Sequence, residues 1–196
     1  MSVTPQVAAA PVLAARRHRF SAFLLDSLLF ALLFAPVHLL SSGEERTDGP
    51  TFEAIVQPYA GNPDWWIEVA STALFAAYFC VQHALWGQTL GKRLCRLKVV
   101  SRATGLPPGL GRSAIRALVH PALFGLPYVG PPLFFVNALA IMVHPKRRCL
   151  HDMITGTMVI DLDGPARRAG GGLLFGLGLL VSLLAALALV DALLLT

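Results

Sequence analysis

Long apolar runs alternate with short charged segments along the chain. Three of these runs cover residues 20–40, 65–86 and 172–196. Each is close to the roughly 20 residues that a helix needs to cross a bilayer. A fourth apolar run, at 115–143, contains four prolines and two glycines. The pattern predicts an all-α membrane protein, a helical bundle of three full spans plus one interrupted segment.

The first apolar run directly follows a basic cluster at 16–19. A positive cluster before an apolar run is also typical of a secretory signal peptide. This run, however, is about 20 residues long, contains Asp26 and lacks a small-x-small cleavage site. We therefore interpret it as an uncleaved first transmembrane helix. The preceding residues, 1–15, are rich in Ala, Pro and Val and predict a flexible N-terminal arm.

The interrupted segment should break near its middle, at the proline- and glycine-rich stretch 125–132, because proline removes a helix hydrogen bond and clashes with the preceding turn. Each half is then about 12 residues, or roughly 18 Å long, which is short for a hydrocarbon core of about 30 Å. A re-entrant hairpin would keep the basic residues 146–148 on the side where the segment began. One kinked span would place them on the opposite side. The hairpin is favoured, and both arrangements stay open.

Two short segments, 97–101 and 157–161, are rich in β-branched residues and bounded by turn residues. This pattern is typical of strands, so we expect a small strand pairing on the cytoplasmic side. The resulting organisation is a membrane domain at 16–161, a linker at 162–171 and an additional C-terminal transmembrane helix at 172–196.

Composition supports the membrane interpretation. Apolar residues make up 55% of the chain, charged residues only 14%, and the mean hydropathy is +0.63. A soluble domain of this size could not hide so much apolar surface, and a disordered chain would contain far less of it. These values exclude an ordinary soluble enzyme and a disordered protein.

The distribution of charge predicts the orientation. Residues 87–116 contain seven basic residues and no acidic one, whereas 41–64 contain five acidic residues and one arginine. The positive-inside rule places 87–116 and the N-terminus in the cytoplasm, and 41–64 outside. A basic cytoplasmic face attracts anionic lipid headgroups. The basic loop lacks interleaved aromatic residues, so we expect lipid and no nucleic acid as its partner.

The cysteines Cys80, Cys95 and Cys149 have no short spacing, and an odd count favours reduced thiols over disulfides. No Cys/His set has zinc spacing, and no nucleophile–base pair is visible. We therefore expect no metal, no cofactor and no enzymatic activity.

Asp26 is the first candidate functional residue. A carboxylate inside an apolar helix is costly and needs a partner, and such acids are functional candidates by default. Arg19, Gln82, His83 and Asn137 are the candidate partners by helix face or by depth, and together with Asp26 they form the predicted ion or proton pathway. A structural ion pair that fixes helix packing is the alternative role.

The second candidate is a cytoplasmic charged cluster. One interpretation is a topogenic cluster at the membrane surface, with Asp152 as a helix cap or an arginine partner. The other is half of a charged cytoplasmic gate. The members of the cytoplasmic charged cluster are Lys92, Arg93, Arg116, Arg147, Arg148, His151 and Asp152.

The segment Gly-Gln-Thr-Leu-Gly-Lys at 87–92 superficially resembles a phosphate-binding loop. Its glycine spacing is one residue short, no Ser or Thr follows the lysine and no hydrophobic strand precedes it. We expect its glycines to let the chain turn sharply as it leaves the second helix.

These motifs together resemble the RDD family of bacterial membrane proteins, which is named for an arginine and two aspartates. The resemblance covers about 16–161 and rests on Arg19-x6-Asp26, on 87–94, and on Leu-His-Asp followed by Gly-Thr at 150–157. It assigns the family arginine to Arg19 and the aspartates to Asp26 and Asp152. His144 and Cys149 depart from the family pattern as we know it.

The resemblance implies a multi-pass protein of the bacterial inner membrane, and some family members resemble cation/proton antiporters. It leaves two hypotheses. The protein is a small transporter that exchanges a monovalent cation for protons at Asp26, which with so few spans implies a homo-oligomer. Alternatively, it is a non-transporting scaffold or accessory subunit whose basic cytoplasmic face docks lipid or a partner protein.

Overall fold

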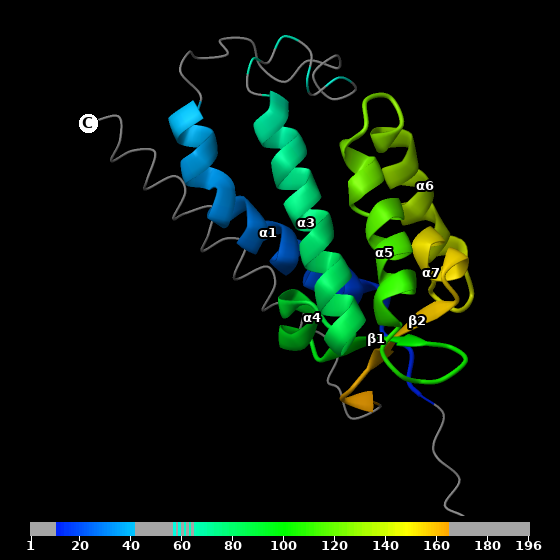
Figure 1. The fold of residues 1–196 in the computed structure, drawn as a ribbon. Helices are drawn as coiled ribbons and strands as arrows, with labels where there is room; N and C mark the ends of the chain where they lie inside the picture. The colour runs from blue at the N-terminus through cyan, green and yellow to red at the C-terminus, as the bar shows by residue number, and fades with distance from the viewer. Residues whose placement is uncertain are drawn as a thin grey trace, which may run out of the picture.

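The structure is a computed structural model that describes residues 11–41, 57, 59, 61, 63 and 65–164. The predicted C-terminal helix at 172–196 and most of the linker lie outside the described residues. The elements are α1 Arg16–Ser41, α3 Trp65–Trp86, α4 Leu90–Leu94, β1 Leu97–Ser101, α5 Gly109–Val119, the 3₁₀ helix η1 Ala122–Gly125, α6 Gly130–Val143, α7 Leu150–Ile154 and β2 Thr157–Asp161 (Figure 1).

The mostly helical architecture agrees with the predicted class. Helix α3 has the predicted bounds, and within the described part of the chain it is the one helix found long and apolar enough to cross a membrane. Helix α1 begins at Arg16, four residues before the predicted run, and includes Pro36. It packs on α4, whereas α3 packs on α5. The number of spans stays a prediction.

The interrupted segment divides into α5, η1 and α6. Helix α5 begins at Gly109, before the predicted start at 115, because its first turns carry a polar face that an apolar-run criterion passes over. Between the helices the backbone folds tightly, and a Cβ at Gly130 would overlap the Phe124 carbonyl oxygen. Helix α6 then turns back toward the end at which α5 begins (Figure 1). The break itself agrees with the sequence prediction; its re-entry into a bilayer stays a prediction.

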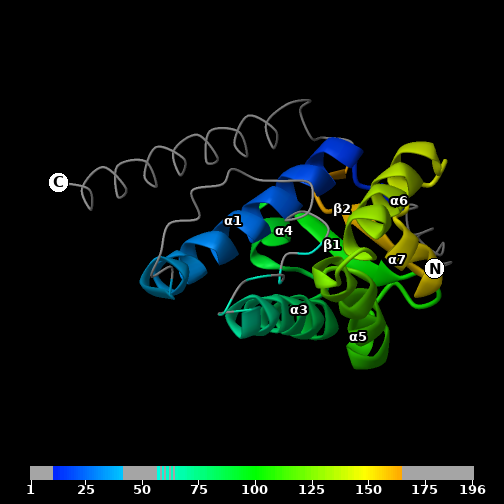
Figure 2. The ribbon, with the colours of Figure 1, turned by 90° about the horizontal axis from the view of Figure 1, so that it is seen from above.

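The predicted strand pairing is confirmed. Strands β1 and β2 are antiparallel, with Leu97 opposite Asp161 and Ser101 opposite Thr157. Seen from above, the pair lies between α1 on one side and α3 and α5 on the other (Figure 2). Leu97 and Val99 are fully buried and form a core with residues of α1 such as Ala22. The sheet therefore anchors the end of the helices at which the basic segment 87–116 begins, the basic end.

The end of the predicted N-terminal arm is not free in the structure. Leu13 forms a β-bridge with Ile160. The Ala14 amide donates to the Val159 carbonyl at 3.0 Å, and the Asp161 amide donates to the Val12 carbonyl at 2.8 Å. Strand β2 has a second edge with backbone groups to satisfy, and residues 12–14 pair with it. The remainder of the arm, 1–10, lies outside the described residues.

Candidate functional site

Asp26 is 1% exposed, and neutral protein groups coordinate its carboxylate. Thr89 Oγ1 donates to Oδ2 at 2.5 Å, while Tyr78 Oη and the Gly91 amide donate to Oδ1 at 2.8 Å each. Hydrogen bonds of this kind stabilise an ionised carboxylate, because each donor replaces a lost water. The carboxylate therefore ties α1 to α3 and to α4.

The segment 87–92 forms the cradle for this carboxylate. Thr89 caps the N-terminus of α4, because its Oγ1 accepts a hydrogen bond from the Lys92 amide at 3.3 Å. The same hydroxyl group donates a hydrogen bond to Asp26. A Cβ at Gly91 would lie 2.9 Å from Asp26 Cγ and would overlap the Ala22 carbonyl oxygen. Gly87 turns the chain with a φ of +69°, as its sequence context predicts. Gly91 serves close helix packing instead.

The structure places none of the four candidate partners against the Asp26 carboxylate. Arg19 binds Asp152, and Asn137 Oδ1 lies 3.1 Å from His151 Nδ1. Buried atoms of Gln82 and His83 face no hydrogen-bond partner among the described residues. The sequence indicates these four candidates by their depth in the membrane or their helix face. Neither property identifies which neighbouring helix supplies the donors.

The donors that sequence reasoning missed are Tyr78 and Thr89. Tyr78 lies one helical turn before Gln82, on the same face of α3, and it is a polar side chain in an apolar run. Thr89 lies within the motif that resembles the family pattern. The polar side chain in an apolar run and the motif are both visible in the sequence. Neither feature indicates contact with Asp26.

Asp152 is fully buried and shared by two arginines. Arg19 Nη2 donates to Oδ2 at 2.5 Å, and Arg116 Nη1 donates to Oδ1. The Cys149 amide also donates to Oδ2, at 3.1 Å, which completes the N-terminal cap of α7. Asp152 is thus both a helix cap and an arginine partner, and it joins α1, α5 and α7.

Electrostatics keep Asp152 ionised. Burial raises the pKa of this carboxyl, but Arg19 and Arg116 outweigh burial and hold its pKa well below its usual range. Thr157 extends the network, because Arg116 donates to Thr157 Oγ1, which lies 3.4 Å from Asp152 Oδ1. The Gly-Thr pair of the sequence motif therefore has two roles: Gly156 turns with a φ of +63°, and Thr157 joins the network.

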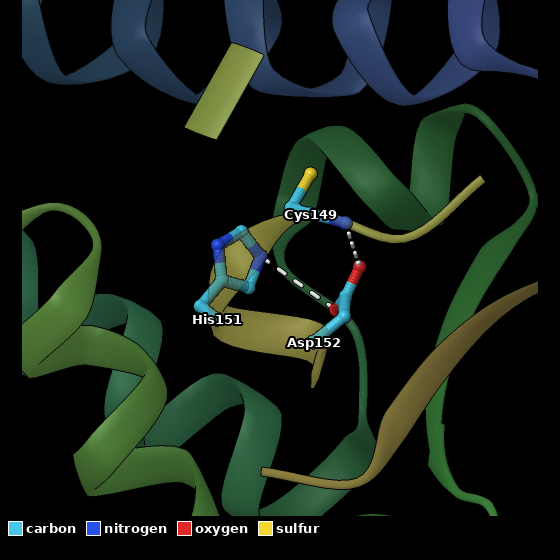
Figure 3. A group of neighbouring side chains, drawn as sticks. All are labelled: Cys149, His151 and Asp152. Carbon is cyan, nitrogen blue, oxygen red and sulfur yellow. Dashed lines mark hydrogen bonds and ion pairs between the residues drawn. The ribbon is translucent and has the colours of Figure 1, made fainter. Parts of the chain in front are cut away.

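Cys149, His151 and Asp152 lie close enough to one another for their side chains to be candidate ligands of one metal ion (Figure 3). Burial raises the pKa of the Cys149 thiol, which disfavours the thiolate that a metal requires. Arg19 Nη2 lies 3.2 Å from the Cys149 sulfur and also holds Asp152. A cation here would compete with two guanidiniums for one carboxylate. The donor set therefore does not fit a metal ion.

The charged cluster that the sequence predicts for the cytoplasmic side divides into a buried and a peripheral part. Its buried members are Lys92, Arg116, His151 and Asp152. The peripheral members include Arg93, whose guanidinium lies 4.8 Å from the centre of the Trp86 ring, and Arg147. Arg148 is half-buried and lies 3.2 Å from a ring nitrogen of His144. Only the peripheral part is available to a membrane surface.

A cavity of about 400 Å³ adjoins this network. Its lining comes from the first turns of α1, the last turns of α3, and from α4 to α7. Lys92 lies on its wall, 5.2 Å from the centre of the Phe79 ring. Burial, offset in part by Asp26, lowers the pKa of Lys92 to about 8. The basic residues that line the cavity are Arg16, Arg17, Arg19, Lys92 and Arg116.

The fold and this site define a mostly helical protein with one candidate membrane helix and a buried arginine–aspartate core. Comparison with known proteins identifies the family. The model of the RDD family matches residues 13–156, and the chain belongs to this family. The arginine and the second aspartate assigned from the family pattern, Arg19 and Asp152, are bound to each other.

The curated relatives are mycobacterial proteins. The chain is 29% identical to the proline-rich antigen homolog of Mycobacterium tuberculosis over 98 residues, which cover 50% of this chain and 38% of the relative. It is 28% identical to the proline-rich antigen of Mycobacterium leprae over 98 residues, 36% of that protein. The match thus spans less than two fifths of these relatives. No solved structure matches the chain.

Proposed function

We propose that the protein is a non-transporting membrane scaffold or accessory subunit whose basic end docks anionic lipid at the cytoplasmic face of the bacterial inner membrane. One observation carries this proposal. Asp26 and Asp152, both buried in the described part of the chain, each bind at least two donors from other elements. These bonds fix helices in place, which is what a scaffold requires.

Cation/proton exchange would need different surroundings for Asp26. A carrier carboxylate must exchange its partners for a cation or a proton, so some of its lone pairs must be replaceable. Asp26 is enclosed by three protein donors, and no acidic residue lines the adjacent cavity within the described part of the chain. The basic lining repels a cation. These features favour the scaffold over the transporter.

The peripheral basic residues support the docking role. Arg93, Arg102, Lys146 and Arg147 are all exposed. Each basic residue near an anionic leaflet contributes about 1 kcal/mol of attraction. We place this end in the cytoplasm, with the N-terminus on the same side, and a homo-oligomer would enlarge the docking face.

Ion-flux measurements on the purified full chain in liposomes test the proposal. We expect the rate at which added Na⁺ or K⁺ collapses a pH gradient to equal that of empty liposomes. We also expect Asp26→Asn to reduce the folded yield, because its amide cannot accept from all three donors, at a cost of about 1–3 kcal/mol. Size-exclusion chromatography of detergent extracts measures this yield.

Asp163→Asn is the matched control, since its ion pair with Arg96 is largely exposed. It should leave the folded yield unchanged. A cation-dependent proton flux that requires the wild-type protein and is lost in folded Asp26→Asn would overturn the scaffold proposal in favour of exchange.

A further inference from the structure

The cavity beside the Arg19–Asp152 network contains buried polar groups that nothing in the described residues satisfies. His83 Nε2 and Arg116 Nε lack hydrogen-bond partners among the described residues, and both residues are 3% exposed. Beside them, Lys92 is 8% exposed, and its ammonium lies 5.2 Å from the centre of the Phe79 ring. Unsatisfied buried polar atoms are costly, so these two atoms next to a buried ammonium indicate a ligand.

The charge of the lining restricts that ligand to an anion. Five basic side chains line the cavity, and no acidic one does within the segments that the structure describes. Asp152, which is paired with Arg19 and Arg116, and Asp26 lie behind the wall and offset part of this charge, but two carboxylates against five basic side chains leave an excess of positive charge. The phosphate oxygens of a phosphodiester suit guanidinium and ammonium donors.

The remaining lining restricts the ligand further, to an amphiphile. Five phenylalanines, Ile141 and Met142 form its apolar part, and the rest of the lining is His83, His120, Asn137, Cys149 and His151. Phe20 on α1 and Met142 on α6 are 55% and 65% exposed, so they lie at the mouth. Both helices also expose large apolar side chains elsewhere, as Leu33 and Val143 show. The opening therefore lies among apolar surfaces suited to hydrocarbon.

We infer that this cavity binds the headgroup of an anionic phospholipid, with the phosphate between Lys92 and Arg116 and the first methylenes of the acyl chains along the phenylalanine wall. A cavity of about 400 Å³ suits a headgroup and the start of its chains. The remaining hydrocarbon stays in the bilayer. This inference deepens the lipid-docking part of the proposed function and rests on it.

Native mass spectrometry of the full chain in neutral detergent tests the inference. Titration with phosphatidylglycerol should give one tightly bound lipid, whereas phosphatidylcholine with the same chains should bind at least about tenfold more weakly because its choline meets basic residues. Glycerol 1-phosphate distinguishes a lipid from a free phosphoester. We expect glycerol 1-phosphate not to displace phosphatidylglycerol. Equal affinity of the protein for glycerol 1-phosphate and phosphatidylglycerol would overturn the lipid assignment.

Lys92→Met should weaken binding of phosphatidylglycerol at least about tenfold, and Lys92→Arg should retain it. Lys98→Met removes the same charge at a position that does not line the cavity, and it should leave the tight site unchanged. Ile141→Trp, which fills the cavity from α6, is the second blocking variant and leaves every charge in place. Equal binding by wild type, Lys92→Met and Ile141→Trp would overturn the proposal.

Failure of this inference can be told apart from failure of the scaffold. If phosphatidylglycerol shows no tight site while liposomes show no ion flux, the cavity proposal is wrong and the scaffold stands. A cation-dependent flux lost in Asp26→Asn overturns the scaffold whatever the lipid titration gives.

Discussion

Replacing Asp152 by Asn is expected to destabilise the folded bundle by about 3–5 kcal/mol, the range measured when one partner of a buried ion pair is removed. Arg19 and Arg116 would then share a buried space without an anion. The cap of α7 would also weaken, because Oδ2 accepts the Cys149 amide. Three elements depend on this one carboxylate, so the loss should affect the whole basic end.

Denaturant unfolding in detergent micelles, followed by tryptophan fluorescence, measures this free energy. The exposed pair Arg96–Asp163 supplies the control, since removing its carboxylate with Asp163→Asn should cost less than about 1 kcal/mol. A loss below 1 kcal/mol for Asp152→Asn would show that the network does not hold the fold.

The same network predicts how the contribution of Asp152 to the unfolding free energy depends on pH. The pKa of Asp152 is depressed in the folded state, so its contribution to stability is present in full above the ordinary value of 3.8. It is lost only as the pH falls below that value toward the folded pKa. The unfolding free energy of wild type minus that of Asp152→Asn should therefore be constant from pH 7 to pH 5.

The elements that local pattern determines could be predicted from the sequence. Helix α3 follows from one apolar run bounded by tryptophans, and its bounds agree with the structure. The strands at 97–101 and 157–161 also agree in bounds, because β-branched residues between turn residues specify short strands without reference to the rest of the fold.

Side-chain partners could not be predicted in this way. Helical periodicity shows that Arg19 and Asp26 share a face, but not which element packs against that face. Asp26 meets Thr89 because α4 packs on α1, a contact across 63 residues. Arg19 meets Asp152 across 133 residues, from the other end of the domain. Such long-range pairings depend on the assembled fold.

The interrupted segment and the N-terminal arm could be predicted only in part. Proline and glycine content identified the break in 115–143, whereas the polar face of α5 concealed its start at Gly109. Composition suggested a flexible arm at 1–15, yet Leu13 pairs with Ile160 because β2 offers a free edge. Edge pairing depends on a strand that must already be in place.

Gly91→Ala is expected to destabilise the protein by about 3 kcal/mol or more, although it adds a single methyl group. That methyl would overlap the Ala22 carbonyl oxygen and lie 2.9 Å from Asp26 Cγ. Backbone atoms cannot move aside as a flexible side chain can, so α4 must separate from α1. Overpacking costs about 1–3 kcal/mol, and separation also breaks the hydrogen bond from the Gly91 amide to Asp26.

Gly111→Ala in α5 is the matched control, because a Cβ at Gly111 meets nothing within 4 Å. Alanine is the better helix former, so this variant should be stabilised by up to about 1 kcal/mol. The two variants should thus shift the unfolding free energy in opposite directions. If Asp26 is the reason for the cost, Gly91→Ala should destabilise an Asp26→Asn background by less than it destabilises wild type. An equal loss in both backgrounds would place the cost in backbone overlap with Ala22 alone.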